Sequence, residues 1–244
     1  MSQGPIDRNI RPMRFGTSVL FFGLPTIVLF VATHWGVPLL NNKTGIPLVV
    51  CWFICGGGLV FFPLTVASFV AFRSEGNSFS SLAIRSRLRL RPMELRDWLW
   101  SLCALVLIGA VTQLLLVFAV RFIPSFSTNP SFMTMDTLRP GEMWILLAWA
   151  PLFLFNIIGE EFFWRGYVLP RQELAYGKWT WVVHGAFWSM FHIAFGWQLM
   201  FILAPLLFAL PYVVQNRKNT WVGIVIHGLI NGSGFLAVAL GAGR

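Results

Sequence analysis

Apolar residues gather in seven long stretches of the chain, and shorter polar segments separate these stretches. Each stretch is long enough, or nearly so, to cross a bilayer as a helix, which takes about 20 residues. The pattern therefore predicts an all-α fold, a polytopic bundle of about seven transmembrane helices. We place the helices at residues 15–38, 46–72, 97–120, 142–164, 180–196, 199–214 and 220–240.

Composition favours the lipid bilayer as the environment and excludes a soluble domain. Of the 244 residues, 57% are hydrophobic and only 11% are charged, whereas a soluble domain carries about a quarter charged residues. Such a chain cannot supply the polar surface that a soluble protein of this size needs. Phe and Trp are abundant, with 24 and 12 residues, which suits lipid-facing helices and interfacial belts.

The formal net charge of +9 is interpreted as a topology signal. Lys and Arg lie between the apolar stretches and form no basic face interleaved with aromatics, so we expect no nucleic-acid partner. With a cytoplasmic N-terminus and seven crossings, most cations fall on the cytoplasmic side, as the positive-inside rule requires. These are Arg8, Arg11, Arg14, Arg73, Arg85, Arg87, Arg89, Arg91, Arg96, Arg165, Arg171, Lys178, Arg217 and Lys218. The other side holds Lys43, Arg121, Arg139 and Arg244.

The order of the stretches also predicts how the chain is organised. The first one follows basic residues like a signal peptide, but its apolar run is longer and lacks a clean cleavage site, so we expect an uncleaved helix. We expect a cytoplasmic segment at 1–14, three transmembrane helices with their loops at 15–141, and a four-helix catalytic core at 142–240. The arginine-rich loop Arg73–Arg96 is interpreted as a topology determinant; the alternative is a strip that binds anionic headgroups or an acidic substrate.

Two carboxylates, Glu160 and Glu161, interrupt the apolar run Trp144–Trp164. A carboxylate at the centre of a transmembrane helix costs about 2.5–3.5 kcal/mol on insertion scales, so a functional role is the first hypothesis. Adjacent helical positions point about 100° apart, and Arg165 lies where it can meet Glu161. We therefore expect a supporting Glu161–Arg165 pair and a Glu160 that faces the bundle interior as a general base. The alternative is a structural ion pair with a spare acid.

Three further polar residues lie inside apolar stretches. His192 lies in the fifth stretch, and His227 and Asn231 lie one turn apart on one face of the last. We expect His34 at the interface and His184 in a structural role. Together with Glu160, these residues suit amide hydrolysis: Glu160 and His192 hold and deprotonate a water, and His227 and Asn231 stabilise the oxyanion.

A metal site is the alternative arrangement of the same residues. Glu160, His192 and His227 would then bind an ion, with zinc as the candidate, whose bound water is the nucleophile. The chain has no H-E-x-x-H or other close-spaced zinc motif. The preferred mechanism therefore requires no cofactor.

The motifs Glu160-Glu161-x-x-x-Arg165, x-x-x-x-His192 and His227-x-x-x-Asn231 resemble those of the CPBP family (CAAX proteases and bacteriocin-processing enzymes), which includes the type 2 CAAX prenyl endopeptidases. The resemblance covers about residues 150–235 and fits in order, spacing and apolar setting. One position departs: the second motif usually has Phe four residues before the His, and this chain has Trp188 there. We expect this aromatic to support the site with a reshaped wall.

The resemblance implies an intramembrane endopeptidase that opens toward the cytoplasm. Its implied substrates are membrane proteins or lipidated, CAAX-like peptides. The family has been described as glutamate-dependent and as metal-dependent, and we favour the glutamate mechanism. Two alternatives belong to other classes: a proton-coupled transporter, since intramembrane Glu and His also form proton relays, and a catalytically idle scaffold or immunity-type protein. The chain shows no inverted repeat of the transporter kind and keeps the full Glu, Arg, His, His and Asn set of the motifs, which favours the enzyme.

Overall fold

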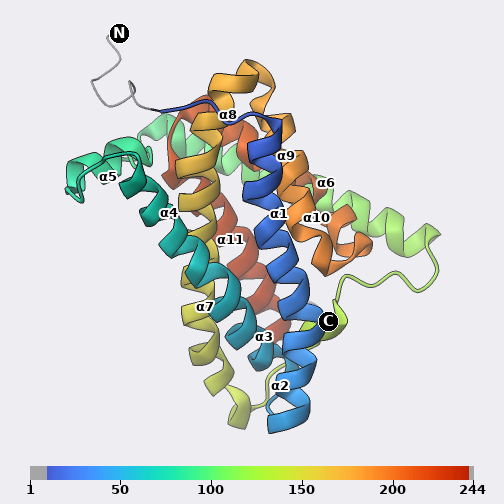
Figure 1. Cartoon of the computed structure of the whole chain (residues 1–244). Helices are drawn as coiled ribbons and strands as arrows, with labels where there is room; N and C mark the ends of the chain where they lie inside the picture. The colour runs from blue at the N-terminus through green and yellow to red at the C-terminus, as the bar shows by residue number, and fades with distance from the viewer. Residues whose placement is uncertain (1–9, 242–244) are drawn as a thin grey trace.

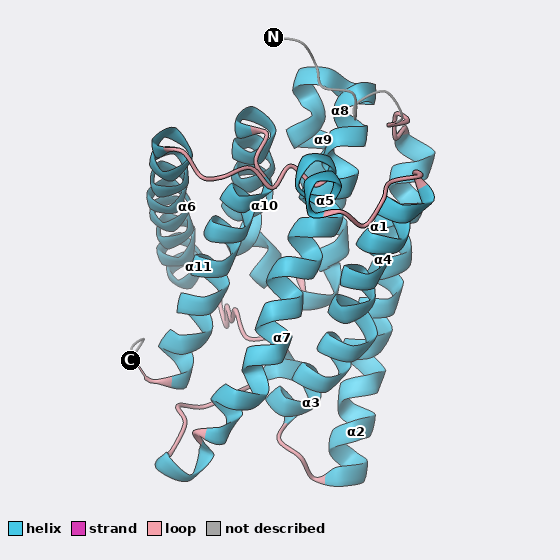
Figure 2. Cartoon of the chain, turned by 90° about the vertical axis from the view of Figure 1, so that its left-hand side faces the viewer, coloured by secondary structure: helices cyan, strands magenta, loops and turns pink. Residues whose placement is uncertain are grey.

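The computed structural model describes residues 10–241, and this part consists of helices and loops without a strand. Figures 1 and 2 show the long helices running side by side in a bundle. The predicted all-α, polytopic fold is confirmed. Arg8 and Arg244, which entered the topology prediction, lie outside the described residues, as do residues 1–9 of the predicted segment 1–14.

Three helical rods make up the first half of the chain. They are α1 (Phe15–Val31) with a π-helical stretch (Ala32–Gly36) and α2 (Val37–Thr44); α3 (Leu48–Gly56) with a second such stretch (Gly57–Phe61) and α4 (Phe62–Ser74); and α6 (Leu95–Phe122), which follows the short α5 (Ser81–Arg87). The sharp turn between the first two rods lies at Gly45, where φ is 69°. This left-handed conformation favours glycine, because other side chains clash there.

The second half places a long rod beside three further helices. These are α7 (Trp144–Glu160) with a π-helical stretch (Glu161–Val168) and α8 (Leu169–Tyr176); α9 (Thr180–Phe191) with a 3₁₀ turn (His192–Phe195); α10 (Trp197–Arg217); and α11 (Thr220–Ala239). Short 3₁₀ turns also occur at Ser131–Met133, Pro140–Glu142 and Gly177–Trp179. Gly177, with φ of 54°, ends α8 and begins the turn that leads into α9.

Six helical runs within residues 10–241 are long and apolar enough to span a membrane, which indicates an integral membrane protein. The difference from seven arises because Pro140–Phe195 forms one candidate run, where the sequence predicts two helices at 142–164 and 180–196. α9 has only 12 residues before its 3₁₀ turn, fewer than the about 20 that a full crossing takes. The number of crossings and the cytoplasmic N-terminus stay predictions.

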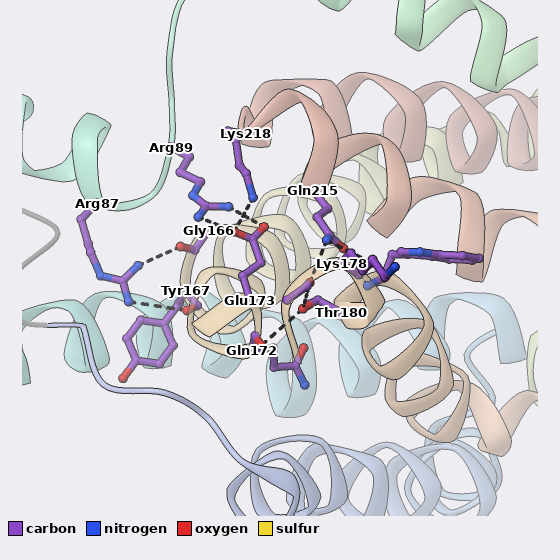
Figure 3. Close-up of polar contacts among 12 residues, drawn as sticks. Arg87, Arg89, Gly166, Tyr167, Gln172, Glu173, Lys178, Thr180, Gln215 and Lys218 are labelled. Atoms are coloured by element: carbon purple, nitrogen blue, oxygen red, sulfur yellow. Dashed lines mark hydrogen bonds and ion pairs between the residues drawn. The ribbon is translucent and has the colours of Figure 1, made fainter. Parts of the chain in front are cut away.

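Basic residues gather at one end of the bundle, formed by residues 11–14, 73–96, 171–180 and 214–221, which we call the basic end. Ion pairs join its loops: Arg87 with Glu75 (2.5 Å), Arg89 with Glu173 (2.8 Å) and Arg217 with Asp97 (2.7 Å). Figure 3 shows Arg89 and Lys218 converging on Glu173, and Arg87 reaching the carbonyl oxygens of Gly166 and Tyr167. These contacts tie α4, α5, α8 and α10 together.

The opposite end of the bundle, which we call the far end, carries the loop 123–143 and the end of α11. The backbone N–H of Leu138 donates to the carbonyl of Ala239 (2.9 Å), which ties this loop to α11. Phe132 is buried and anchors the loop, since its ring lies 5.6 Å from the ring of Trp52 and 5.7 Å from that of Phe195. These contacts anchor the loop to the bundle at the far end.

Close packing of α7 against α4 depends on a glycine beside the first carboxylate. A Cβ on Gly159 would lie 2.5 Å from Thr65 Oγ1 and 2.6 Å from the carbonyl oxygen of Phe61. Small residues let helix backbones approach closely in membrane bundles. Gly159 thus fixes the position of the helix that carries Glu160 and Glu161.

Candidate active site

One cavity of about 410 Å³ lies inside the bundle, and apolar side chains form most of its wall. Five polar side chains from three helical segments face it: Asn156, Glu160, His192, His227 and Asn231. The structure thus brings together the four residues for which the sequence predicts a catalytic role. Glu161, Arg165 and Trp188, with a predicted supporting role, are buried outside the cavity lining.

Glu160 is held by two hydrogen-bond donors. Asn156 Nδ2 donates to its Oε1 (2.7 Å), and the indole N–H of Trp188 donates to its Oε2 (2.8 Å). The carboxylate is only 1% exposed, so each donor offsets part of the cost of keeping it away from bulk water. These contacts fix the orientation of the carboxylate at the cavity wall.

Glu161 points away from Glu160, toward α11. Its Oε1 lies 3.2 Å from Arg165 Nη1 and 2.9 Å from His227 Nδ1. Both partners and the carboxylate are almost fully buried. The sequence predicts the contact with Arg165 but misses the contact with His227. Glu161 thus links the EExxxR motif on one helix to the last motif on another.

The Arg165 guanidinium lies over the face of Trp188, with its Cζ 3.5 Å from the ring centroid. None of its three nitrogens has a hydrogen bond within the part of the chain that the structure describes. Its charge is therefore balanced by the Glu161 carboxylate and by the π-electrons of the indole. Trp188 accordingly contacts both the cation and, through its N–H, the Glu160 carboxylate.

Gly223 is the second glycine that the site requires. A Cβ at this position would lie 2.2 Å from Glu161 Oε2. At that distance the two atoms would clash, so the surrounding structure would have to shift. Gly223 precedes His227 by one helical turn on α11. The glycine therefore leaves the space that the Glu161 carboxylate fills beside His227.

The two histidines take defined tautomers from their partners. His192 Nδ1 lies 2.9 Å from the carbonyl oxygen of Trp188, so Nδ1 carries the proton and the lone pair is on Nε2. In the same way, His227 Nδ1 donates to Glu161, and its Nε2 accepts from Asn231 Nδ2 (3.1 Å). His192 thus presents a proton acceptor at the cavity.

A residue outside the predicted set completes the polar network. Asn156 accepts a hydrogen bond from Asn231 Nδ2 (3.1 Å) through its Oδ1 and donates to Glu160 through its Nδ2. It lies one helical turn before Glu160 in the same apolar run, which is the signal that could have identified it. Asn156 connects the first and last motifs across the cavity.

The donor set does not fit a metal in this arrangement. Both oxygens of Glu160 accept hydrogen bonds, and both ring nitrogens of His227 are engaged. Among residues 10–241, no three His, Cys, Asp or Glu side chains form a group that could hold an ion. To bind an ion together with Glu160 and His192, His227 would first have to release the hydrogen bond from Asn231 to its Nε2.

The cavity extends from the polar residues toward the far end, where it is lined by Thr128, Asn129, Met133 and Met135 of the loop 123–143. Asn129 is exposed, as are Gly234 and Val238 across the cavity on α11. The Lys and Arg pattern predicts a cytoplasmic basic end, and the family resemblance implies a cytoplasmic opening. Both expectations stay predictions.

The fold and the site define an integral membrane protein with a buried carboxylate–histidine–amide centre. Residues 142–233 match the family model described as type II CAAX prenyl endopeptidase Rce1-like. This match confirms, over residues 142–233, the resemblance to the CPBP family that the motifs indicate, and it indicates a CAAX-type protease. No curated protein and no solved structure matches the chain.

Replacing Trp188 with Phe, the usual residue of the family, is expected to lower kcat by about tenfold and leave KM little changed. The ring would still fill the space beside Arg165, but Glu160 would lose one N–H donor, and hydrogen bonds to charged groups contribute about 1.5–3 kcal/mol. Trp181→Phe, a change on the same helix near the basic end, is the matched control. Equal turnover by wild type and Trp188→Phe would show that this hydrogen bond does not position the base.

Proposed function

We propose that this protein is an intramembrane endopeptidase in which Glu160 activates a water to hydrolyse a peptide bond. The observation that carries the proposal is the convergence of a carboxylate, two imidazoles and two carboxamides from three helical segments on one mostly apolar cavity. Such groups are costly to place inside a membrane, so their presence there indicates a function. The proposed substrates are membrane proteins or lipidated, CAAX-like peptides, which bring the cleaved bond to the cavity.

In the proposed reaction, a water lies between Glu160 and Nε2 of His192. Glu160 accepts a proton as the water oxygen attacks the carbonyl carbon of the substrate, which forms a tetrahedral intermediate with a negatively charged oxygen. The C–N bond then breaks, and the proton held by Glu160 passes to the departing amine. The Asn156 and Trp188 hydrogen bonds keep the carboxylate oriented during both proton transfers.

Stabilisation of the oxyanion is assigned to His227 and Asn231. In the resting arrangement, Asn231 Nδ2 donates to His227 Nε2 and to Asn156, so the Asn231 amide must turn toward the substrate oxygen. A proton on Nε2 would make His227 an imidazolium, and Glu161 is placed to stabilise that charge. The buried Glu161–Arg165 pair thus supports the histidine through its other ring nitrogen.

Replacing Asn231 with Ala is expected to lower kcat by about 10²–10³-fold with a smaller change in KM, because an oxyanion donor acts mainly in the transition state. The rate of peptide cleavage over a range of substrate concentrations measures both constants. Ser233→Ala, an exposed position on the same helix, is the control. An effect confined to KM would contradict the oxyanion role.

The proposed mechanism requires no metal, so activity is expected to persist after treatment with a zinc chelator. The hydrogen-bonded state of Glu160 and His227 supports this expectation. Cleavage is measured with purified protein before treatment, after treatment and after zinc is added back. Activity that is lost on treatment and restored by zinc alone would favour the metal mechanism.

The test of the proposed function compares the termini of membrane proteins in cells that express wild type or Glu160→Gln at matched levels. Cleavage products present only with wild type are the expected result, and they identify the substrate class directly. Identical termini, together with full complementation of a deletion phenotype by Glu160→Gln, would instead favour a scaffold. Proton-coupled uptake that depends on Glu160 without any cleavage would favour a transporter.

A further inference from the structure

An open groove of about 520 Å³ runs along the outer face of α4 and reaches the basic end of the bundle. It is lined by Val66, Phe69, Val70, Arg73, Ser74 and Phe79, and we call it the α4 groove. The first four of these residues follow the i, i+3, i+4, i+7 spacing, so they lie on one face of the helix. The groove shares no lining residue with the active-site cavity. It is therefore a separate feature of the molecule.

The walls of the α4 groove are apolar and suit a hydrocarbon chain. Val66 and Val70 are 43% and 62% exposed, and α4 lies at the edge of the bundle with α5 projecting beyond it (Figure 1). Phe79 forms the opposite wall, because its ring packs against that of Phe72 with 5.8 Å between centroids. At 1.5 Å per residue, the stretch from Val66 to Arg73 is about 10 Å long. Part of an acyl chain can therefore lie along it.

A cation without a carboxylate partner stands where this apolar path ends. Arg73 is exposed, and within residues 10–241 its guanidinium makes one hydrogen bond, from Nη1 to the carbonyl oxygen of Asn77 (2.9 Å). The nearby Glu75 is already engaged by Arg87 (2.5 Å) and lies 3.8 Å from Arg171. A guanidinium presents five N–H donors in a planar fork that matches a phosphate. Most of the donors of Arg73 are therefore left for an anion from outside the chain.

The short helix α5 places a second free cation and an apolar side chain beside the groove wall. Leu82 and Arg85 lie three residues apart on one face of α5, and both are exposed. Arg85 has no ion pair with the part of the chain that the structure describes. Exposed Leu and Phe side chains next to arginines are typical of a segment at the level of the lipid headgroups. This segment, like Arg73, therefore favours negative charge at the membrane surface.

We propose that the α4 groove is a binding site for an anionic phospholipid. One acyl chain lies along Val66 and Val70, and the headgroup phosphate binds the Arg73 guanidinium. An anionic headgroup is preferred to a zwitterionic one, because a zwitterionic headgroup brings its own cation close to Arg73 and Arg85. The arginine-rich loop thus contributes a lipid site in addition to its role as a topology signal. The proposal depends neither on proteolysis nor on which side of the membrane the basic end faces.

Photolabelling tests the proposal with the full-length protein in phosphatidylcholine vesicles. The vesicles contain a small fraction of phosphatidylglycerol that carries a photoactivatable group on one acyl chain, and mass spectrometry locates the attached lipid after illumination. We expect labels on residues of the α4 groove. Arg73→Gln should reduce this labelling by about fivefold, the effect of one Arg near an anionic surface. Arg96→Gln is the matched control, since Arg96 is an exposed cation at the basic end on α6, across the bundle from α4 (Figure 2).

Two further variants separate the headgroup from the chain. Arg73→Lys keeps the charge and should retain most of the labelling, whereas Val70→Trp fills the groove from an exposed position and should abolish labelling there. Thermal unfolding of each variant verifies that it is folded.

Equal labelling of the groove in wild type and Arg73→Gln would overturn the proposal. So would equal labelling by phosphatidylcholine that carries the same photoactivatable chain, because the groove would then be an unselective lipid-facing surface. The same labelling is expected in a Glu160→Gln background. A failure of the proposed proteolysis therefore leaves this test intact.

Discussion

Glu160→Gln is expected to reduce peptide-bond cleavage by about 10²–10⁴-fold, which is the usual contribution of a general base. Gln has nearly the same shape as Glu but cannot accept a proton from water. Because Glu160 lines the cavity and forms no ion pair with a partner among residues 10–241, the change removes the proton acceptor without breaking an ion pair. The protein should therefore still be produced and inserted in the membrane.

The measurement is the initial rate of cleavage by purified wild type and variant, together with their thermal unfolding in the same detergent. Glu142→Gln is the matched control, since Glu142 is exposed in the turn before α7 and surface changes shift stability by about 0.5 kcal/mol or less. Retained cleavage by Glu160→Gln would remove this residue from the role of base. Loss of folded protein would mean that the carboxylate is structural.

Glu161→Gln is expected to have the opposite profile, with a large loss of stability. It would leave the Arg165 guanidinium buried with neither its carboxylate partner nor a hydrogen bond, and breaking a buried pair in this way costs about 3–5 kcal/mol. It would also remove the acceptor of His227 Nδ1. We expect a marked decrease in thermal stability and in the yield of inserted protein.

A double-mutant cycle separates the lost charge pair from other effects. Glu161→Gln combined with Arg165→Met removes both charges, so the double variant should be more stable than Glu161→Gln alone. The coupling energy is the effect of the double variant minus the effects of the two single variants. If Glu160→Gln and Glu161→Gln had the same stability and the same activity, the two carboxylates would share one role. The division between a base and a supporting ion pair would then be wrong.

The long helices and the polar motif residues could be predicted from the sequence because both signals are local. A run such as Leu95–Phe122 is apolar from end to end, and a carboxylate within such a run is conspicuous at once. The exception is the predicted helix at 180–196, which reads as one apolar stretch. The structure divides it at His192, where the backbone tightens into a 3₁₀ turn and directs the imidazole to the cavity.

Contacts between segments far apart in sequence could not be predicted. Asn156 and Gly223 carry no charge and look ordinary in an apolar helix, yet one bridges two motifs and the other leaves room for Glu161. In the sequence, Trp188 is only a replacement of one aromatic residue type by another, and the fold is needed to show that its N–H donates to Glu160. The shape of the cavity likewise depends on how α7, α10 and α11 pack together rather than on any motif.

The π-helical stretch Glu161–Val168 gives the first motif an unusual dependence on chain length. Its backbone bonds span five residues, as in the bond from the Leu169 N–H to the Trp164 carbonyl, so the stretch holds more residues per turn than the α-helix on either side. Removing one residue, for example Phe162, would let the stretch wind as a regular α-helix, which nearly preserves the orientation of the helix beyond it but moves Arg165 from four to three residues after Glu161. The site therefore depends on the number of residues in this stretch as well as on their identity. A deletion that keeps every motif side chain would still change how these side chains are arranged.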